Sequence, residues 1–242
     1  MDVRDGFILG IYNYCDRWCE TCAFTSRCRV FADRAEMDAA MDPYLKAVAE
    51  APPLPEEEPP PPPRWMQEMI AEMNAAAREP LSPEEVRRLL PQVRPEHTPI
   101  ERRARGYCLR TAEWLQAHGM DDVRDPADPR SVIGWFCTFL PPKIYRALSG
   151  LDDDWDDDDF PRDSDGSAKA ALIGIERSHA AWLDLAERGL TTMTEATPFI
   201  AELIWLGEAL ERVFPKARAF VRPGFDEPEE VARLLADEQS SG

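Results

Sequence analysis

Cys15, Cys19, Cys22 and Cys28 lie within one short segment near the start of the 242-residue chain. Their spacing, C-x3-C-x2-C-x5-C, is short enough for the four sulfurs to converge on one point without help from the rest of the fold. In a reducing compartment, clustered cysteines are more often thiolate ligands than disulfides. The segment therefore predicts a closed four-cysteine metal site, around which the rest of the chain must be arranged.

The identity of the metal stays open between an iron–sulfur cluster and zinc. Structural zinc sites usually take two short cysteine pairs from separated turns, whereas one loop that supplies several thiolates is typical of iron–sulfur clusters. Cys19, Cys22 and Cys28, in CETCAFTSRC, resemble the end of the four-iron cluster loop in helix-hairpin-helix DNA glycosylases. That resemblance implies a 4Fe-4S cluster. It covers about ten residues, and the spacing before Cys19 is shorter than in that family, so the DNA chemistry is not carried over.

Cys15, Cys19 and Cys22 are also similar to the C-x3-C-x2-C triad of radical SAM enzymes, which leave one iron open for the cofactor. Cys28 would close that iron, and Thr21 stands where an aromatic residue usually precedes the last cysteine. The chain also lacks the alternating strands and helices of such a barrel. We therefore expect a 4Fe-4S cluster or Zn²⁺ held by all four cysteines, with a loop that binds no metal as the remaining alternative.

Charge and hydropathy narrow the classes of partner. A formal net charge of −18 opposes binding to phosphate backbones, which requires clustered lysines and arginines. No apolar run approaches the roughly 20 residues of a membrane span, and the N-terminus has no signal-peptide pattern. We expect a cytoplasmic protein with no nucleic-acid or membrane partner, which leaves a protein as the partner class to consider.

Apolar residues at helical spacing predict helices over most of the remaining chain. The first is expected from about residue 30, bent or broken near Pro43. Residues 51–63, APPLPEEEPPPPP, predict an extended polyproline spacer. Residues 64–79 then form a helix with an apolar stripe that we expect to pack against the main body. This stripe consists of Trp65, Met66, Met69, Ile70 and Met73.

Capping signals and prolines predict where the next helices begin and end. Ser82 with Glu85, and Thr98 with Glu101, have the spacing of capping boxes. The second pair opens the clearest helix, residues 99–118. Asp128 then starts a further apolar segment, which the two prolines at 141 and 142 are expected to divide into two helices.

The last third of the chain follows an acidic run, LDDDWDDDDF, that predicts an extended loop. We expect a helix over residues 168–188 with Ser167 as its cap. Thr197 is expected to open another helix, central in the bundle because it has little polar face. Asp226 with Glu229 predicts a cap for a short final helix.

A second candidate metal site lies on these helices. Glu176 and His179 form an E-x-x-H pair of the kind that di-iron bundles use, and Glu113, Glu202 and Glu208 lie on other predicted helices. Such bundles need a second E-x-x-H, which the chain lacks. A buried histidine with one polar partner is therefore the simpler interpretation of His179.

The two remaining cysteines, Cys108 and Cys137, lie in apolar helical surroundings. We expect inert thiols in the core, because free cysteine packs as a small hydrophobic residue. They are left out of the predicted ligand set.

These patterns predict a mostly α-helical bundle with an N-terminal four-cysteine metal-binding loop. The expected domains are residues 1–50 with the loop and its helix, a linker over 51–63, and a main body over 64–242 with which the first part can pack as one domain. The leading functional hypothesis is a metal-binding protein with a structural or electron-transfer role. The alternatives are a zinc-stapled protein-interaction module and a helical metalloenzyme that uses Glu176 and His179.

Overall fold

The structure is a computed structural model that describes residues 2–50, 61–76, 82, 84–85, 93–118, 125–152, 162–229 and 232. The chain divides into two compact units. Met1–Cys28 packs with Gln92–Gly242, and Arg29–Pro91 forms the second unit. The described residues are mostly helical, as the sequence predicts.

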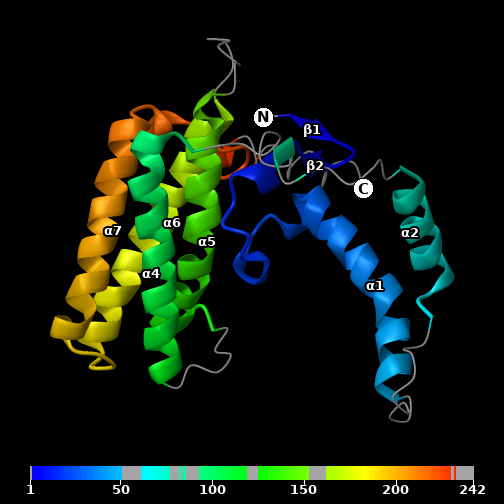
Figure 1. The fold of residues 1–242 in the computed structure, drawn as a ribbon, viewed down its shortest axis with the longest axis horizontal. Coiled ribbons are helices and arrows are strands. Elements are labelled where there is room, and N and C mark those ends of the chain that lie inside the picture. Colours follow the sequence, from blue (N-terminus) through cyan, green and yellow to red (C-terminus); the bar gives the residue numbers. More distant parts are fainter. Residues whose placement is uncertain are drawn as a thin grey trace. The chain divides into compact units, whose positions relative to one another are not determined.

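The first unit is built on four helices that form a closed bundle (Figure 1). Each helix packs against the next along the chain, and the first also packs against the last. The four are α4 (Thr98–Ala117), α5 (Pro129–Ser149), α6 (Asp163–Glu187) and α7 (Met193–Val213). Three 3-10 turns accompany them: η4 (Pro95–His97), η5 (Gly150–Asp152) and η6 (Ala217–Ala219).

Helix α4 confirms the clearest prediction from periodicity. Its buried residues recur at three- and four-residue steps: Ile100, Ala104, Tyr107, Thr111 and Leu115. Its expected capping box is absent, however, because His97 takes the N-cap position without a side-chain bond. Glu101 instead pairs with Arg105 one turn later. A nearby ion pair offers the carboxylate stronger donors than a helix N-terminus does.

Helix α5 is one continuous helix, so the predicted division at the proline pair is wrong. Pro141 and Pro142 lie inside it, and the Asp128 carboxylate caps its start by accepting from the Arg130 backbone N–H at 2.8 Å. Interior prolines cost roughly 3 kcal/mol. Fully buried apolar residues lie on both sides of the prolines, and their burial outweighs that cost. These buried residues are Ile133, Phe136, Leu140, Ile144, Ala147 and Leu148.

Helices α6 and α7 both begin four or five residues earlier than their predicted caps. Ser167 lies inside α6 with no exposed surface and is not a cap. Thr197 lies inside α7, whose capping box is formed by Thr192 and Glu195. The helix therefore starts with a threonine cap, as expected, but the cap is Thr192 and not Thr197. Ile204 of α7 is 48% exposed, so this helix has a solvent face and α6 is the more buried of the two.

The bundle core combines aromatic rings with a short polar network. Trp182 stacks on Phe199 with ring centroids 4.3 Å apart, and Trp114 meets Trp182 edge-on at 4.9 Å. Tyr107 Oη lies 2.6 Å from Ser178 Oγ and accepts from Trp182 Nε1 at 3.1 Å. Burial raises the pKa of Tyr107 to about 12, so the phenol stays protonated and the network is uncharged at neutral pH.

The N-terminal segment begins with a two-residue hairpin. Strands β1 (Val3–Arg4) and β2 (Phe7–Ile8) pair antiparallel, with Val3 opposite Ile8. Asp5 and Gly6 both have positive φ, as a type I′ hairpin turn requires. Ile8 is buried against Gly224, where an added Cβ would lie only 3.1 Å from the isoleucine. The start of the chain thus packs against the turn that follows the bundle.

The second unit contains α1 (Arg29–Glu50) and α2 (Arg64–Ala76). Helix α1 runs through Pro43 without a break, so of the predicted bend or break the break is wrong. Good helix formers surround the proline. The apolar stripe of α2 is largely exposed within this unit, up to 64% at Met73. Ser82 and Glu85 exchange the hydrogen bonds of a capping box, as predicted.

Several predictions lie outside the described residues. They include most of the proline spacer, most of the acidic run and the end of the last helix. Asp226, expected to cap that helix, instead accepts from Arg222 and pairs with Lys169 at 2.7 Å. Within the described ranges, no helix is both long and apolar enough to span a bilayer.

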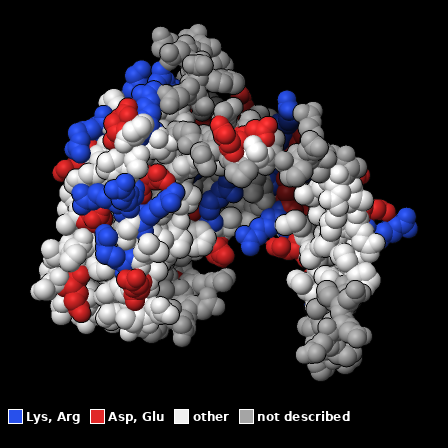
Figure 2. All heavy atoms as spheres, in the orientation of Figure 1, with Lys and Arg blue, Asp and Glu red and all other residues white. Residues whose placement is uncertain are grey.

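Charged residues on the bundle surface pair across helices. Figure 2 shows basic and acidic side chains lying among one another on the visible face. Arg103 and Arg110 of α4 both reach Glu202 of α7, at 2.5 Å and 3.3 Å. Partly exposed pairs of this kind contribute little net stability, so the bundle depends on its core.

Two serines of α6 provide a matched test of that core. Ser167 and Ser178 are both fully buried, but only Ser178 has a hydrogen-bond partner. Ser178→Ala should lower the free energy of unfolding by about 1–3 kcal/mol, because the buried Tyr107 hydroxyl loses a partner. Ser167→Ala should be neutral or stabilising, because it removes an unpaired polar atom. Urea unfolding measures both, and equal losses would contradict the assigned network.

Candidate metal centre

The four cysteines lie on a chain of short turns at the edge of the bundle. Three 3-10 turns shape it: η1 (Ile11–Asn13), η2 (Cys19–Thr21) and η3 (Thr25–Arg27). Cys15 follows the first turn, Cys19 opens the second, and Cys22 and Cys28 end the second and third. We call residues 11–28 the cysteine loop. Tight turns bring backbone N–H groups close to the sulfurs that precede them, which suits thiolate ligands.

Trp18 anchors the loop to the bundle. Arg17 has a φ of 61°, and this left-handed residue turns the chain so that the Trp18 ring points inward. The ring is 3% exposed and stacks on Trp135 of α5, with centroids 5.2 Å apart and planes 16° apart. It also meets the edge of Phe136 at 6.4 Å. Burial of so large a side chain makes Trp18 the main apolar contact of the loop with α5.

Asp16 supplies polar contacts beside this stack. Its backbone oxygen accepts from Trp135 Nε1 at 2.8 Å, and its carboxylate pairs with Arg177 Nη1 of α6 at 2.5 Å. The same carboxylate accepts from the Trp18 backbone N–H at 3.1 Å. The guanidinium of Arg177 in turn lies 4.9 Å from the Phe136 ring centroid. One residue next to Cys15 thus joins the loop to both α5 and α6.

Tyr14 packs against α6 at Gly166. Its hydroxyl donates to Asp163 at 2.9 Å, and its ring lies 4.7 Å from that of Phe220. A Cβ at Gly166 would lie 2.4 Å from the Tyr14 ring, so only glycine leaves space for it. Burial, and then the bond to Asp163, raise the pKa of Tyr14 well above its usual value, so the hydroxyl remains a donor.

Lys143 of α5 is a buried cation beside the loop. Its ammonium donates to the backbone oxygen of Asn13. Burial lowers its pKa to about 8, while the nearby Cys15 acts in the opposite direction. A thiolate at Cys15 would therefore stabilise the protonated form of this lysine. No local sequence pattern indicates this pairing.

The far end of the loop is held by aromatic contact with the C-terminal segment. Phe24 meets Phe225 edge-on at 5.0 Å, and Arg222 lies over the Phe225 ring at 5.1 Å. Burial would raise the pKa of Asp226, but hydrogen bonds from Arg222 and Lys169 outweigh it and lower that pKa strongly. A charged, paired carboxylate thus fixes the segment that supports Phe24.

The four thiols themselves are half-buried and free of disulfides. Burial raises the pKa of Cys19, and the neighbouring Cys15, Cys22 and Cys28 raise it further. Burial also raises the pKa of Cys15 and Cys22. Hydrogen bonds from the backbone N–H groups of Arg17 and Phe24 lower these two pKa values, but by less. The Phe24 N–H lies 3.4 Å from Cys22 Sγ. The charge state of Cys19 thus depends on the other three thiols. Because raised pKa values favour the protonated thiols, a metal ion would have to displace their protons on binding.

The thiols are near one another but are not arranged as a finished site. Within the described ranges, no three or more histidine, cysteine, aspartate or glutamate side chains already have the positions needed to hold a metal ion. Metal binding would have to draw the sulfurs together by rotation of side chains and small movements of the turns. The contacts of Trp18, Asp16 and Tyr14 do not involve the thiols, so they can persist during such a movement.

The alternative site around Glu176 and His179 is not brought together. Glu176 is exposed and pairs with Arg218 at 2.5 Å. His179 is half-buried, beside the core face of α6 that runs through Ser178 and Trp182. The other three predicted carboxylates also lie away from it. Glu202 pairs with Arg103 and Arg110, Glu208 lies 4.0 Å from Arg212, and Glu113 is exposed.

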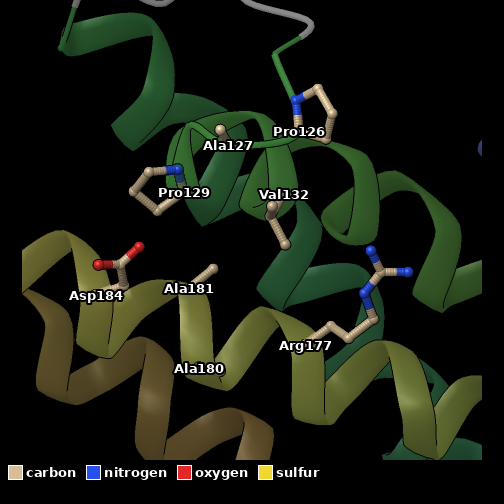
Figure 3. Close-up of a pocket in the computed structure, with 8 residues that line it drawn as sticks. All are labelled: Pro126, Ala127, Pro129, Val132, Arg177, Ala180, Ala181 and Asp184. Atoms are coloured by element: carbon tan, nitrogen blue, oxygen red, sulfur yellow. The ribbon is translucent and has the colours of Figure 1, made fainter. Parts of the chain in front are cut away.

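A shallow groove of about 310 Å³ lies between the start of α5 and α6 (Figure 3). Its walls are mostly apolar, with Arg177 and Asp184 at its two sides. Asp184 pairs with Arg188, and Arg177 is the residue that pairs with Asp16 of the cysteine loop. The groove is thus connected to the loop through Arg177.

Comparison with protein-family models, with curated protein sequences and with solved structures finds no match to this chain. The residues that position the loop and were missed by sequence reasoning are Asp16, Trp135, Lys143 and Arg177. Between 119 and 161 residues separate Asp16 from its two partners, so no local pattern could indicate them.

The anchoring role of Trp18 can be tested by hydrogen exchange. Replacing a buried tryptophan by alanine costs about 3–5 kcal/mol, so Trp18→Ala should make local opening of residues 11–28 at least roughly a hundredfold more frequent. Amides of α6 should keep their protection. Trp65→Ala on α2, where the ring is 37% exposed, is the matched control and should leave the loop unchanged. Equal exchange in the loop of both variants would show that Trp18 is not the anchor.

Proposed function

We propose that Cys15, Cys19, Cys22 and Cys28 bind one metal centre, a 4Fe-4S cluster in preference to Zn²⁺, which serves as a structural or an electron-transfer centre. One observation carries the proposal. Cys19 has the other three thiols as electrostatic neighbours on one loop, and that loop is fixed to the bundle by contacts that involve none of the thiols. The support that a set of thiolate ligands would need is therefore already in place.

The surroundings of the thiols suit a negatively charged cluster. Arg17 and Lys143 are close enough to Cys15 to lower its pKa in part, and thus offset thiolate charge. Backbone N–H groups directed at sulfur stabilise thiolates and tune the reduction potential of a cluster. The ligand spacing, in one continuous loop, favours the cluster over zinc.

Exposure of the loop bears on the role of the centre. The thiols are half-buried, so electrons could pass between a bound cluster and a partner protein at this surface. Because the bundle core lies elsewhere, a purely structural metal would mainly order residues 11–28. Electron transfer is therefore the role that makes fuller use of the site.

One specific observation favours the alternative of a zinc-stapled interaction module. Trp65, Met69, Ile70 and Met73 of α2 are exposed on one apolar stripe. Methionine-rich stripes of this kind adapt to protein partners. The absorption spectrum separates the two proposals, since a cluster absorbs broadly near roughly 400 nm whereas zinc thiolates leave the sample colourless.

The proposed ligand set is tested by Cys19→Ala in protein purified without oxygen. Loss of one thiolate should remove most of the metal and the absorbance, because each ligand contributes to binding. Cys108→Ala, which removes a half-buried thiol outside the loop, is the matched control and should keep both. Elemental analysis of iron, zinc and sulfide gives the metal content. Full metal content in Cys19→Ala would rule out the proposed site.

A further inference from the structure

The groove between the start of α5 and α6 is a cavity that the proposed metal centre does not use. Its walls are mostly apolar, with Pro126 and Pro129 at the start of α5 and Ala181 on α6 (Figure 3). The proline rings fix the backbone on one side and a helix fixes it on the other, so the groove exists before any ligand binds. Its volume of about 310 Å³ lies at the lower end of the range for small-molecule sites, roughly 300–1,000 Å³.

The charge of Asp184, at one end of the groove, is neutralised by Arg188. Arg188 Nε donates to Asp184 Oδ1 at 2.8 Å, and Arg188 Nη2 lies 2.7 Å from Asp184 Oδ2. The third nitrogen, Nη1, donates to the backbone oxygen of Ala127, which lines the groove, at 3.2 Å. Each nitrogen of this guanidinium thus has an acceptor within the protein, and this end presents little net charge to a ligand.

Arg177, at the other end of the groove, has donors to spare. Its side chain is 41% exposed, and Nη1 pairs with Asp16 at 2.5 Å. In the part of the chain that the structure describes, its Nε and Nη2 have no hydrogen-bond acceptor. The face of the guanidinium lies over the Phe136 ring, 4.9 Å from the centroid, which leaves the edge with these N–H groups for another partner.

The first residues on the α5 side of the groove add no free backbone donor. Pro126 and Pro129 have no N–H group, and the Ala127 N–H donates to Asp125 Oδ1 at 2.9 Å. Polar recognition in the groove therefore depends on Arg177, and the other surfaces suit an apolar group.

We propose that this groove binds a small monocarboxylate with an apolar body, and that Arg177 binds its carboxylate. The planar edge of a guanidinium presents two parallel N–H donors, a geometry that matches the two oxygens of a carboxylate. The apolar body, a single ring or a branched chain, lies along Val132 and Ala181. A single negative charge fits best, because a protein with a net charge of −18 repels more highly charged anions.

Binding in the groove would act on the cysteine loop through Arg177. The same guanidinium pairs with Asp16, so a bound carboxylate shares this cation with the loop. The lining residues of the groove belong to α5, α6 and the segment before α5, and none of them is a cysteine. The site does not depend on the proposed metal centre, so the two proposals can fail separately.

Titration of the ¹⁵N-labelled full chain with 3-phenylpropionate, followed by amide NMR at constant pH and ionic strength, tests the site. The amides of residues 177–184 and of Val132 should shift and saturate. We expect a Kd on the order of 1 mM, as for a shallow site and a ligand of about eleven non-hydrogen atoms. The alcohol 3-phenylpropan-1-ol has the same body without the charge and should bind at least roughly fivefold more weakly, because it forms no charge-assisted hydrogen bond.

Three variants locate the binding. Ala180 lines the groove and is exposed, so Ala180→Leu should fold and should block the groove, which weakens binding of the acid at least roughly fivefold. Ala201→Leu, at an exposed position of α7 outside the groove, is the matched control and should bind as the wild-type protein does. Arg177→Met keeps an apolar stem without the guanidinium, so the acid and the alcohol should bind equally. Ala180→Leu still decides the location if Arg177→Met does not fold.

The proposal is overturned if the acid causes no saturable shifts, or if the alcohol binds to the wild-type protein as tightly as the acid does. Unchanged binding in Ala180→Leu would also overturn it, because the ligand would then lie elsewhere. Shifts of the same amides on dilution of the ligand-free protein would indicate that the groove is a contact between two copies of the chain, which contradicts a small-molecule site.

Discussion

The stack of Trp18 on Trp135 is the contact on which the proposed site depends. It buries the largest side chain of the cysteine loop against α5, and the neighbouring Asp16 adds a hydrogen bond from the same Trp135 and an ion pair with α6. A ring buried at this depth contributes several kcal/mol, more than the partly exposed ion pair beside it. The loop is therefore positioned by packing first, and its charged contacts set its orientation. Cys15 and Cys19 flank this anchor in the sequence, so the anchor also limits where the thiols can lie.

Close packing of α5 against α6 makes this docking surface. A Cβ at Gly174 would lie 3.0 Å from Phe136 and 3.1 Å from Leu140, so the absence of a side chain lets the two helices approach. Gly166 lies eight residues before Gly174 on α6, and its lack of a side chain likewise leaves room for the Tyr14 ring of the loop. Small residues on α6 thus serve both the core and the cysteine loop. Helix α5 presents Trp135 and Lys143 to the loop and Cys137 to the core, because its faces point in different directions.

Local patterns explain what the sequence could predict. The periodicity of α4 is regular because one of its faces is buried, and the capping box of Ser82 with Glu85 depends on residues only three apart. The prolines of α5 led to a wrong prediction of two helices, because helix propensity reflects only the local sequence. Burial of residues in both halves of that helix depends on tertiary packing, which the local sequence does not show. The same reasoning applies to Ser167 and Thr197, which are reasonable caps by type but lie inside helices set by packing. The cysteine cluster was visible because its members are close in sequence. Its partners Trp135, Lys143 and Arg177 come from distant helices, and only the fold brings them together.

X-ray absorption at the metal edge of protein purified without oxygen tests the central claim most directly. If the loop cysteines bind one metal centre, the first shell should contain sulfur alone, with iron–iron scattering for a cluster or zinc–sulfur distances of about 2.3 Å for zinc. A protein without bound metal, or a first shell made of nitrogen and oxygen, would contradict the account.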